Sequence, residues 1–241
     1  MLVDVVLYAG ERHLLDARIA LLKADITLVI QGTHSFTNQE KPIYDLPKNV
    51  IGVNVESHKY ENPWDNEKAL RHEGSLRLND LDLPDDAIVG YFDVDEIPDA
   101  ALIRKTSHLI AWDMPKYQMS LAWFQPLMDR EGLSGVSALW GQVKNENAQT
   151  LRSNRALHAT VKSGWHLSSF MTLEELKTKW RNFSHQELVK DDMDAWIENC
   201  WINGLAVENG KPLTEQPMTD LPAEFYKLPD YMKRTRPQSR G

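Results

Sequence analysis

The sequence contains a single cysteine, Cys200, among 241 residues. One cysteine forms no internal disulfide, and no Cys/His spacing of the zinc-finger type occurs, so a disulfide-stapled or zinc-stapled module is excluded. Long apolar runs are also missing. None approaches the roughly 20 residues that span a bilayer, and no basic leader precedes the first apolar run. We therefore expect a cytoplasmic protein without a membrane span.

Positive charge is scarce, with 27 Lys+Arg against 35 Asp+Glu and a formal net charge of −8 at pH 7. The chain also lacks a stripe of lysines and arginines. Tight, sequence-independent binding to a phosphate backbone depends on clustered cations, so that class of function is disfavoured. With 42% hydrophobic residues, the chain is long enough to bury a proper core without covalent staples.

Apolar runs alternate with amphipathic segments in the first half, which predicts an α/β fold. Strands are expected at Leu2–Tyr8, Ile26–Gln31, Val50–Val55 and Ala87–Asp93, and helices at Glu11–Lys23 and from about Asp65 to Leu78. Strands linked by helices form a mostly parallel sheet covered on both faces. Ligands bind beyond the carboxyl ends of such strands, so a site is expected after Tyr8, Gln31, Val55 and Phe92.

The second half predicts short strands, antiparallel or mixed, followed by helices. The strands are expected at Tyr117–Phe124, Ser137–Val143 and Ala156–Val161. Thr172 and Glu175 form a capping-box pattern at the start of one helix, and a second helix is expected to open near Asp191. Prolines recur from Pro212 to Pro237, so we expect an irregular strap and tail over 211–241.

Three carboxylates, Asp93, Asp95 and Glu96, stand where the apolar strand expected at Ala87–Asp93 ends. Two carboxylates that flank one residue can both reach a hard divalent cation, and that cation can bridge two phosphate oxygens. The alternative is a solvated acidic loop, because acidic pairs are common on such loops. The apolar strand before the triplet and Pro98 after it favour the metal site.

Two histidine segments also carry chemistry. His166 follows Gly164 and Trp165 and can complete a metal sphere or accept a proton; the alternative is a structural histidine bonded to a backbone carbonyl. His185 and Glu187 stand at the end of a helix that carries Lys177, Lys179 and Arg181. The alternative to a functional role is that these cations only form the solvated face of the helix.

Residues near the N-terminus suit the recognition of phosphate. Glu11 and Arg18 lie on the first helix, and Arg71 lies on the helix before the acidic strand. The arginine fork matches phosphate oxygens, although surface ion pairing is equally expected. Trp64, Trp123 and Trp165 are the tryptophans best suited to stack on a sugar ring.

Five segments taken in order resemble glycosyltransferase family 17, which contains the β-1,4-mannosyl-glycoprotein N-acetylglucosaminyltransferases and many short bacterial and phage relatives. They are Glu11–Arg18, Thr33–Pro42, Asp93–Pro98, Gly164–Ser168 and Phe183–Glu187. One such segment means little, but five in sequence at the family's rough spacing are hard to obtain by chance. The chain is most similar to the short relatives.

The resemblance implies a GT-A type fold and an inverting transfer of a sugar, such as GlcNAc, from a nucleotide-diphosphate donor. A UDP-sugar is the expected donor, and Mn²⁺ or Mg²⁺ is the expected cofactor. Asp93, Asp95 and His166 would hold the metal. Asp95, Glu96, His185 and Glu187 are the candidate catalytic residues, with the base left open among the last three. Tyr8, Glu11, Arg18, Gln31, Arg71, Asp93 and Trp165 would bind the donor.

The resemblance further implies one GT-A-like domain over 1–241. Residues 1–115 would form the nucleotide-sugar half and 116–210 the acceptor half, followed by the strap and tail. Two positions depart from the family pattern: Gln31 stands where relatives carry an acidic residue, and His72 where they carry Asn. The acceptor is expected to be a glycan, a protein or a modified nucleobase.

Two other functions stay open on the sequence. A non-catalytic sugar-nucleotide or glycan-binding protein of the same fold predicts metal-dependent nucleotide binding without donor hydrolysis. A metal-dependent phosphohydrolase that uses the aspartate pair predicts phosphate release from simple nucleotides. The acidic triplet and both histidine segments favour the glycosyltransferase.

Overall fold

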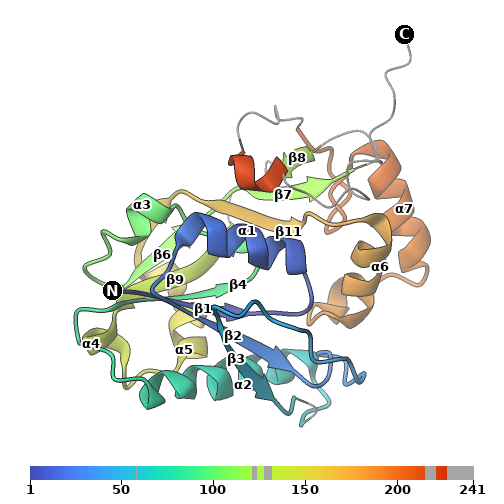
Figure 1. Ribbon diagram of the computed structural model, residues 1–241. Helices are drawn as coiled ribbons and strands as arrows, with labels where there is room; N and C mark the ends of the chain where they lie inside the picture. The colour runs from blue at the N-terminus through green and yellow to red at the C-terminus, as the bar shows by residue number, and fades with distance from the viewer. Residues whose placement is uncertain (58, 121–123, 128–131, 215–220, 227–241) are drawn as a thin grey trace.

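The computed structural model describes residues 1–57, 59–120, 124–127, 132–214 and 221–226. Within these residues a seven-stranded sheet of order β10-β6-β9-β4-β1-β2-β3 forms the centre of the molecule (Figure 1). Its strands are β1 Leu2–Leu7, β2 Ile26–Gly32, β3 Ile51–Val55, β4 Ile88–Asp93, β6 Ile110–Asp113, β9 Leu133–Leu139 and β10 Ala159–Lys162.

This sheet is mostly parallel, as predicted. β1 pairs in parallel with β2 and β4, β2 with β3, and β6 with β10, whereas β9 runs antiparallel to β4 and β6. A second sheet has the order β5-β11-β7-β8. Its strands are β5 Glu96–Ile97, β7 Lys116–Met119, β8 Phe124–Leu127 and β11 Trp165–Ser169. The α/β fold of GT-A type, with mixed strands in the second half, is thereby confirmed.

Helices cover both faces of the large sheet (Figure 1). The α-helices are α1 Arg12–Leu22, α2 Pro63–Leu76, α3 Ala100–Ile103, α4 Trp140–Val143, α5 Ala148–Ser153, α6 Leu173–Asn182 and α7 Met193–Asn203. Short 3₁₀ turns are η1 Arg77–Asp80, η2 Arg155–Leu157, η3 Gln186–Leu188 and η5 Ala223–Tyr226. Within the described chain, none of the helices has the length and apolarity needed to cross a membrane.

Alternation along β1 divides the core into two layers. Val6 and Tyr8 pack with α1, the second sheet, α6 and α7, whereas Val3 and Val5 pack with α2, α4 and α5 on the other face. Because both faces of the strand are covered, β1 is buried along its whole length. Packing on both faces thus fixes the position of the central strands, and with it the position of any site at their carboxyl ends.

Several boundaries in the second half differ from prediction. The strand expected at Ser137–Val143 is wrong in its second part, because β9 ends at Leu139 and the chain turns into α4. Backbone bonds cause that turn: Trp140 N donates to Ala87 O at 2.7 Å and Gly141 N to Asp85 O at 2.9 Å. The strand expected from Ala156 begins only at Ala159, after η2.

Two further differences concern single strands. β6 is absent from the prediction, and so is β11, the strand that contains His166. Trp123 and the tail beyond residue 226 lie outside the described residues.

Candidate active site

The acidic triplet lies at the carboxyl edge of the large sheet, as predicted. β4 ends at Asp93, and the chain turns through Val94 and Asp95 before Glu96 opens β5. β11 pairs antiparallel with β5, which sets His166 opposite Glu96. The main sheet and the second sheet therefore meet at the three carboxylates.

Arg18 supports this turn from beneath. It is fully buried and donates two hydrogen bonds to the Asp4 carboxylate, from Nε at 2.7 Å and from Nη2 at 2.6 Å. Its Nη1 donates to the carbonyl oxygens of Glu96 at 2.5 Å and Asp93 at 3.3 Å. The sequence predicts donor binding by Arg18, but in the structure its nitrogens are occupied by the protein. Arg18 holds the turn in shape.

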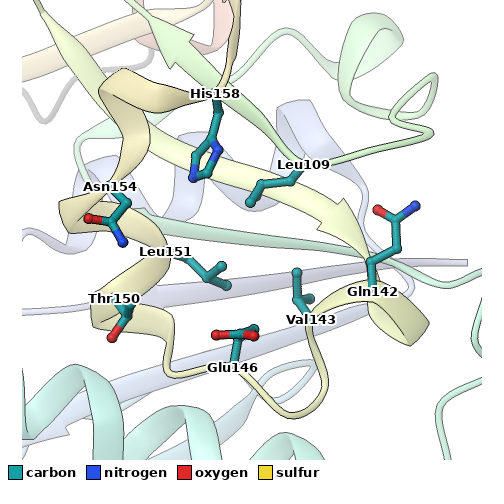
Figure 2. A pocket seen from close by; sticks show the side chains of 8 residues that line it. All are labelled: Leu109, Gln142, Val143, Glu146, Thr150, Leu151, Asn154 and His158. Atoms are coloured by element: carbon teal, nitrogen blue, oxygen red, sulfur yellow. The ribbon is translucent and has the colours of Figure 1, made fainter.

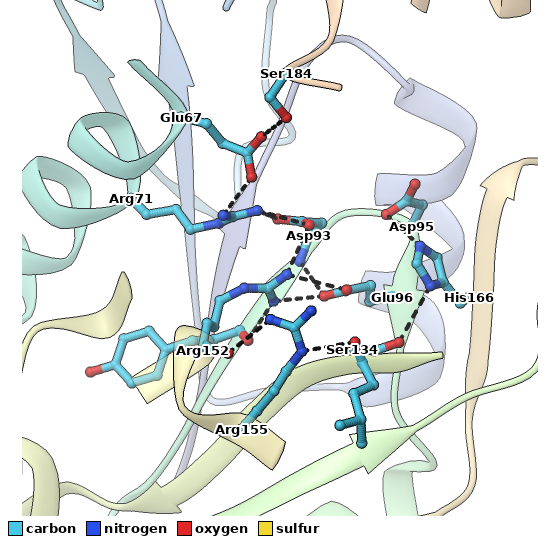
Figure 3. A network of polar contacts seen from close by, with 12 residues as sticks. Glu67, Arg71, Asp93, Asp95, Glu96, Ser134, Arg152, Arg155, His166 and Ser184 are labelled. Atoms are coloured by element: carbon cyan, nitrogen blue, oxygen red, sulfur yellow. Dashed lines mark hydrogen bonds and ion pairs between the residues drawn. The ribbon is translucent and has the colours of Figure 1, made fainter. Parts of the chain in front are cut away.

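Asp93 and Glu96 belong to a closed network of ion pairs, which we call the arginine cluster: Glu67, Arg71, Asp93, Glu96 and Arg152 (Figure 3). Arg71 Nη2 donates to both oxygens of Asp93, at 2.7 and 2.9 Å, and Arg152 Nη2 donates to Asp93 Oδ2 at 2.9 Å. Arg152 also donates to both oxygens of Glu96, at 2.7 and 3.2 Å. Glu67 completes the network by pairing with Arg71 Nη1 at 2.5 Å.

These pairs favour the charged forms of Asp93 and Arg152. Burial alone would raise the pKa of Asp93, but the charges of Arg152 and Arg71 outweigh burial and hold that pKa well below its usual range. Burial likewise opposes the charge of Arg152, and Asp93 and Glu96 nevertheless raise the pKa of its guanidinium. Glu96 is buried with both oxygens bonded, so it is poorly placed to take a proton from a substrate.

Asp95 has a different environment, which we call the Asp95 side: Asp95, Ser134, His166 and Lys179. Asp95 Oδ2 accepts a hydrogen bond from Lys179 Nζ at 2.9 Å, while Oδ1 lies 3.9 Å from His166 Nε2. Ser134 Oγ lies 3.4 Å from the other ring nitrogen of His166 (Figure 3). Burial opposes the charge of Asp95, and Lys179 and His166 together lower its pKa.

The Asp95 side fits a divalent ion that the ligand helps to hold. Two donors on one ion, each about 2.1 Å from it, lie about 3 to 4 Å apart, which matches Asp95 Oδ1 and His166 Nε2. Over the described residues no group of three or more His, Cys, Asp or Glu side chains forms a complete metal site. Magnesium-type sites commonly use one or two carboxylates with substrate phosphates and water. Asp93 is less suited, since arginines occupy both of its oxygens.

The predicted donor-binding residues at the carboxyl ends of β1 and β2 anchor the loop around Tyr44. Gln31 is buried, donates to Tyr44 O at 3.1 Å and accepts from Tyr44 N at 3.0 Å. Tyr8 packs edge-on against the Tyr44 ring with centroids 5.7 Å apart. Gly10 has φ +119, and a Cβ there would lie 2.6 Å from that ring. Glu11 accepts from Ala9 N at 3.2 Å. Gln31 thus fixes the loop around Tyr44 rather than facing a ligand.

His185 and Glu187 form a half-exposed pair beside α2. His185 Nδ1 lies 2.7 Å from Glu187 Oε1, and the His185 ring stands edge-on to Trp64 with centroids 4.2 Å apart. The hydrogen bond from His185 lowers the pKa of Glu187. Ser184 hydrogen-bonds to Glu67, which ties this segment to the arginine cluster (Figure 3). Trp165, by contrast, packs its ring against Phe225.

The sequence-based prediction does not identify three cations of the site. It does not name Arg152 and Arg155, and it names Lys179 only as a helix cation that could be solvated. Arg152 and Arg155 lie three residues apart around the end of α5, with no apolar pattern or family segment to mark them. Lys179 is one of the helix cations whose alternative explanation is a solvated face, and the structure turns it inward onto Asp95. The only sequence signal for these partners is an excess of carboxylates that need counter-charges.

A separate pocket of about 290 Å³ lies beside α5, and Arg152 of that helix does not line it (Figure 2). Leu109, Val143 and Leu151 supply its apolar lining. His158 also lines it, and its Nε2 is buried without a hydrogen-bond partner in the described chain. None of the carboxylates of the acidic triplet lines this pocket, so it is distinct from the candidate active site.

Comparison with protein families gives one match. The model of the family described as Glycosyltransferase family 17 matches residues 1–208, which include the arginine cluster and the Asp95 side. A search of curated proteins finds no match to the chain.

Proposed function

The chain belongs to glycosyltransferase family 17, and from this premise we propose an inverting transfer of a sugar from a nucleoside-diphosphate donor to an acceptor hydroxyl. Glycosyltransferase activity follows from the family. The donor is proposed as a UDP-sugar, GlcNAc being a candidate, and the acceptor as a glycan, a protein or a modified nucleobase. One observation carries the proposal: Asp95 Oδ1 and His166 Nε2 lie 3.9 Å apart at the edge where ligands of such sheets bind. The bacterial or phage setting and the cytoplasmic location stay predictions.

Mn²⁺ or Mg²⁺ is the proposed cofactor, with Asp95 and His166 as its protein ligands. When bound, the ion supplies positive charge that stabilises the departing diphosphate. Carboxylates and cations near the site are equal in number, although Arg155 has no carboxylate in direct contact. The four carboxylates are Glu67, Asp93, Asp95 and Glu96, and the four cations are Arg71, Arg152, Arg155 and Lys179. The donor diphosphate carries two negative charges and gains a third as it leaves, so the site needs the charge of a metal ion in addition to that of its side chains.

His185 is the proposed base, oriented by Glu187. Its Nδ1 proton points to the Glu187 carboxylate in the tautomer that this pairing favours, so Nε2 carries the lone pair. In the transfer the acceptor oxygen bonds to the anomeric carbon and the bond from that carbon to the diphosphate oxygen breaks. The electron pair leaves with the diphosphate, and the acceptor proton goes to His185 Nε2.

Donor binding is tested by thermal shift with UDP-, GDP-, ADP-, CMP- and dTDP-sugars, each with and without Mn²⁺. A ligand of the native state raises the melting temperature, and we expect a metal-dependent rise with the UDP-sugars. No rise with any nucleotide sugar contradicts the proposal. Phosphate release from simple nucleotides would favour a phosphohydrolase instead.

The base is tested with His185→Gln, Glu187→Gln and the exposed control His108→Gln. With water as the acceptor, donor hydrolysis should lose about 10²- to 10⁴-fold in kcat for His185→Gln, with the donor KM unchanged. Glu187→Gln should lose less, because it only orients the ring. Added imidazole should restore part of the rate to His185→Ala. Full activity in His185→Gln would exclude His185 as the base.

A further inference from the structure

Arg155 is a half-buried cation at the edge of the candidate active site. Its Nε donates to Leu133 O at 2.9 Å and its Nη1 to Arg152 O at 2.8 Å. Both acceptors are neutral carbonyl oxygens. Among the residues that the structure describes, Arg155 forms no ion pair, and its Nη2 has no hydrogen-bond partner. The two carbonyls therefore fix the guanidinium but leave its charge uncompensated by direct contact.

The position of Arg155 links the two parts of the site. Leu133, which it binds, precedes Ser134, whose Oγ lies 3.4 Å from His166 Nδ1. Arg152, which it also binds, lies in the arginine cluster. Figure 3 shows the Arg155 guanidinium beside the Arg152–Glu96 pair, on the side toward Ser134. Arg155 is therefore linked to the Asp95 side through Leu133 and Ser134, and to the arginine cluster through Arg152.

Arg155 and Arg152 have divided roles although they lie three residues apart. Arg152 donates from its two Nη nitrogens to Asp93 and Glu96, so the protein itself occupies these nitrogens. Burial, and then the like charge of Arg152, lower the pKa of Arg155, so its cation is held in an unfavourable place. An anion that approached Arg155 would relieve this cost and gain a charge-assisted hydrogen bond.

We propose that Arg155 binds the diphosphate of the nucleotide donor and stabilises the negative charge that grows on it as it leaves. This inference rests on the proposed function. A planar fork with a free nitrogen matches phosphate oxygens, and the carbonyls of Leu133 and Arg152 preorganise it, so little side-chain freedom is lost on binding.

The test is isothermal titration of the full chain with UDP, UMP and uridine in Mn²⁺, or with the matching set for the base that the thermal-shift panel identifies. Loss of one hydrogen bond to a charged group, about 1.5–3 kcal/mol, should weaken diphosphate binding by about 10- to 100-fold in Arg155→Ala. Nucleoside affinity should be unchanged, and the monophosphate should lie between. Arg155→Lys keeps the charge but loses the fork, and should bind the diphosphate more weakly than wild type and more tightly than Arg155→Ala.

The control is Arg77→Ala, which removes an exposed arginine from η1 and should bind as wild type. Should Arg155→Ala fail to fold, Arg155→Lys gives the decision, since a charge of the same sign remains. If the folded Arg155 variants bind the diphosphate as tightly as wild type, the role proposed for Arg155 is overturned, while the proposed function stands. If wild type binds no nucleoside diphosphate under any metal condition, the proposed function fails and the role of Arg155 falls with it.

Discussion

The arginine cluster and the Asp95 side both draw carboxylates from one four-residue stretch, Asp93–Glu96, yet they are built differently. Asp93 and Glu96 are saturated by Arg71 and Arg152. Asp95 has one oxygen on Lys179, while the other faces a histidine nitrogen at a distance that an ion can bridge. Neighbouring carboxylates of one motif thus have different surroundings, which supports the proposal that two stabilise the turn and one binds a ligand.

The largest effect on stability should come from opening the arginine cluster. Arg152→Met leaves Glu96, whose side chain is 4% exposed, without its cation and removes one of two cations from Asp93. Breaking a buried pair in this way costs about 3–5 kcal/mol of unfolding free energy, measured by urea unfolding at pH 7. Lys179→Met removes the partner of a single carboxylate and should cost less. An equal or greater loss in Lys179→Met would refute the contrast between the two regions.

Acid should lower the unfolding free energy through protonation of Asp93, and Asp93→Asn should remove this part of the pH dependence. Arg152 and Arg71, acting against burial, lower the pKa of Asp93 in the folded state, so below the unfolded pKa of about 3.9 the unfolded chain binds the extra proton. Stability from Asp93 is therefore complete above that pH and is lost as the pH falls toward the folded pKa. Between about pH 3.5 and 2, wild type should lose at most about 1.4 kcal/mol per pH unit more than Asp93→Asn. Identical acid slopes in urea unfolding would contradict this pairing.

The smallest effect is expected at an exposed ion pair of the same chemistry. Arg77 and Asp80 lie 3.3 Å apart with side chains 63% and 65% exposed. Water and salt screen such pairs, so Arg77→Ala should change the unfolding free energy by about 0.5 kcal/mol or less. A loss approaching that of Arg152→Met would show that burial does not set the difference between the pairs.

The sequence predicts well those features that depend on local pattern. The first four strands of the large sheet and both long helices of the first half lie within a few residues of prediction, because apolar alternation and helical spacing extend over whole elements. The capping box at Thr172 is present as expected. The acidic triplet also falls at the predicted sheet edge, since strands linked by helices run parallel and bring their carboxyl ends to one edge.

Features decided by distant contacts were beyond such prediction. Arg152 pairs with Asp93 across 59 positions, and nothing in the local sequence marks the two as partners. The apolar run through Leu139 and Trp140 continues without a break, so only the bonds to Ala87 and Asp85 show where β9 ends. Gln31 fits a ligand contact by its place near the carboxyl end of β2, but its amide hydrogen-bonds to the backbone of Tyr44.

The measurement that tests the central claim most directly is the Mn²⁺ dependence of UDP affinity in wild type, Asp95→Asn and Asp93→Asn, by titration calorimetry on folded protein. If Asp95 is the carboxylate open to a metal, Asp95→Asn abolishes the gain in affinity that Mn²⁺ gives to wild type, whereas Asp93→Asn retains it. The opposite pattern, in which the gain survives in Asp95→Asn and vanishes in Asp93→Asn, would contradict the division of the acidic triplet into structural and ligand-facing carboxylates.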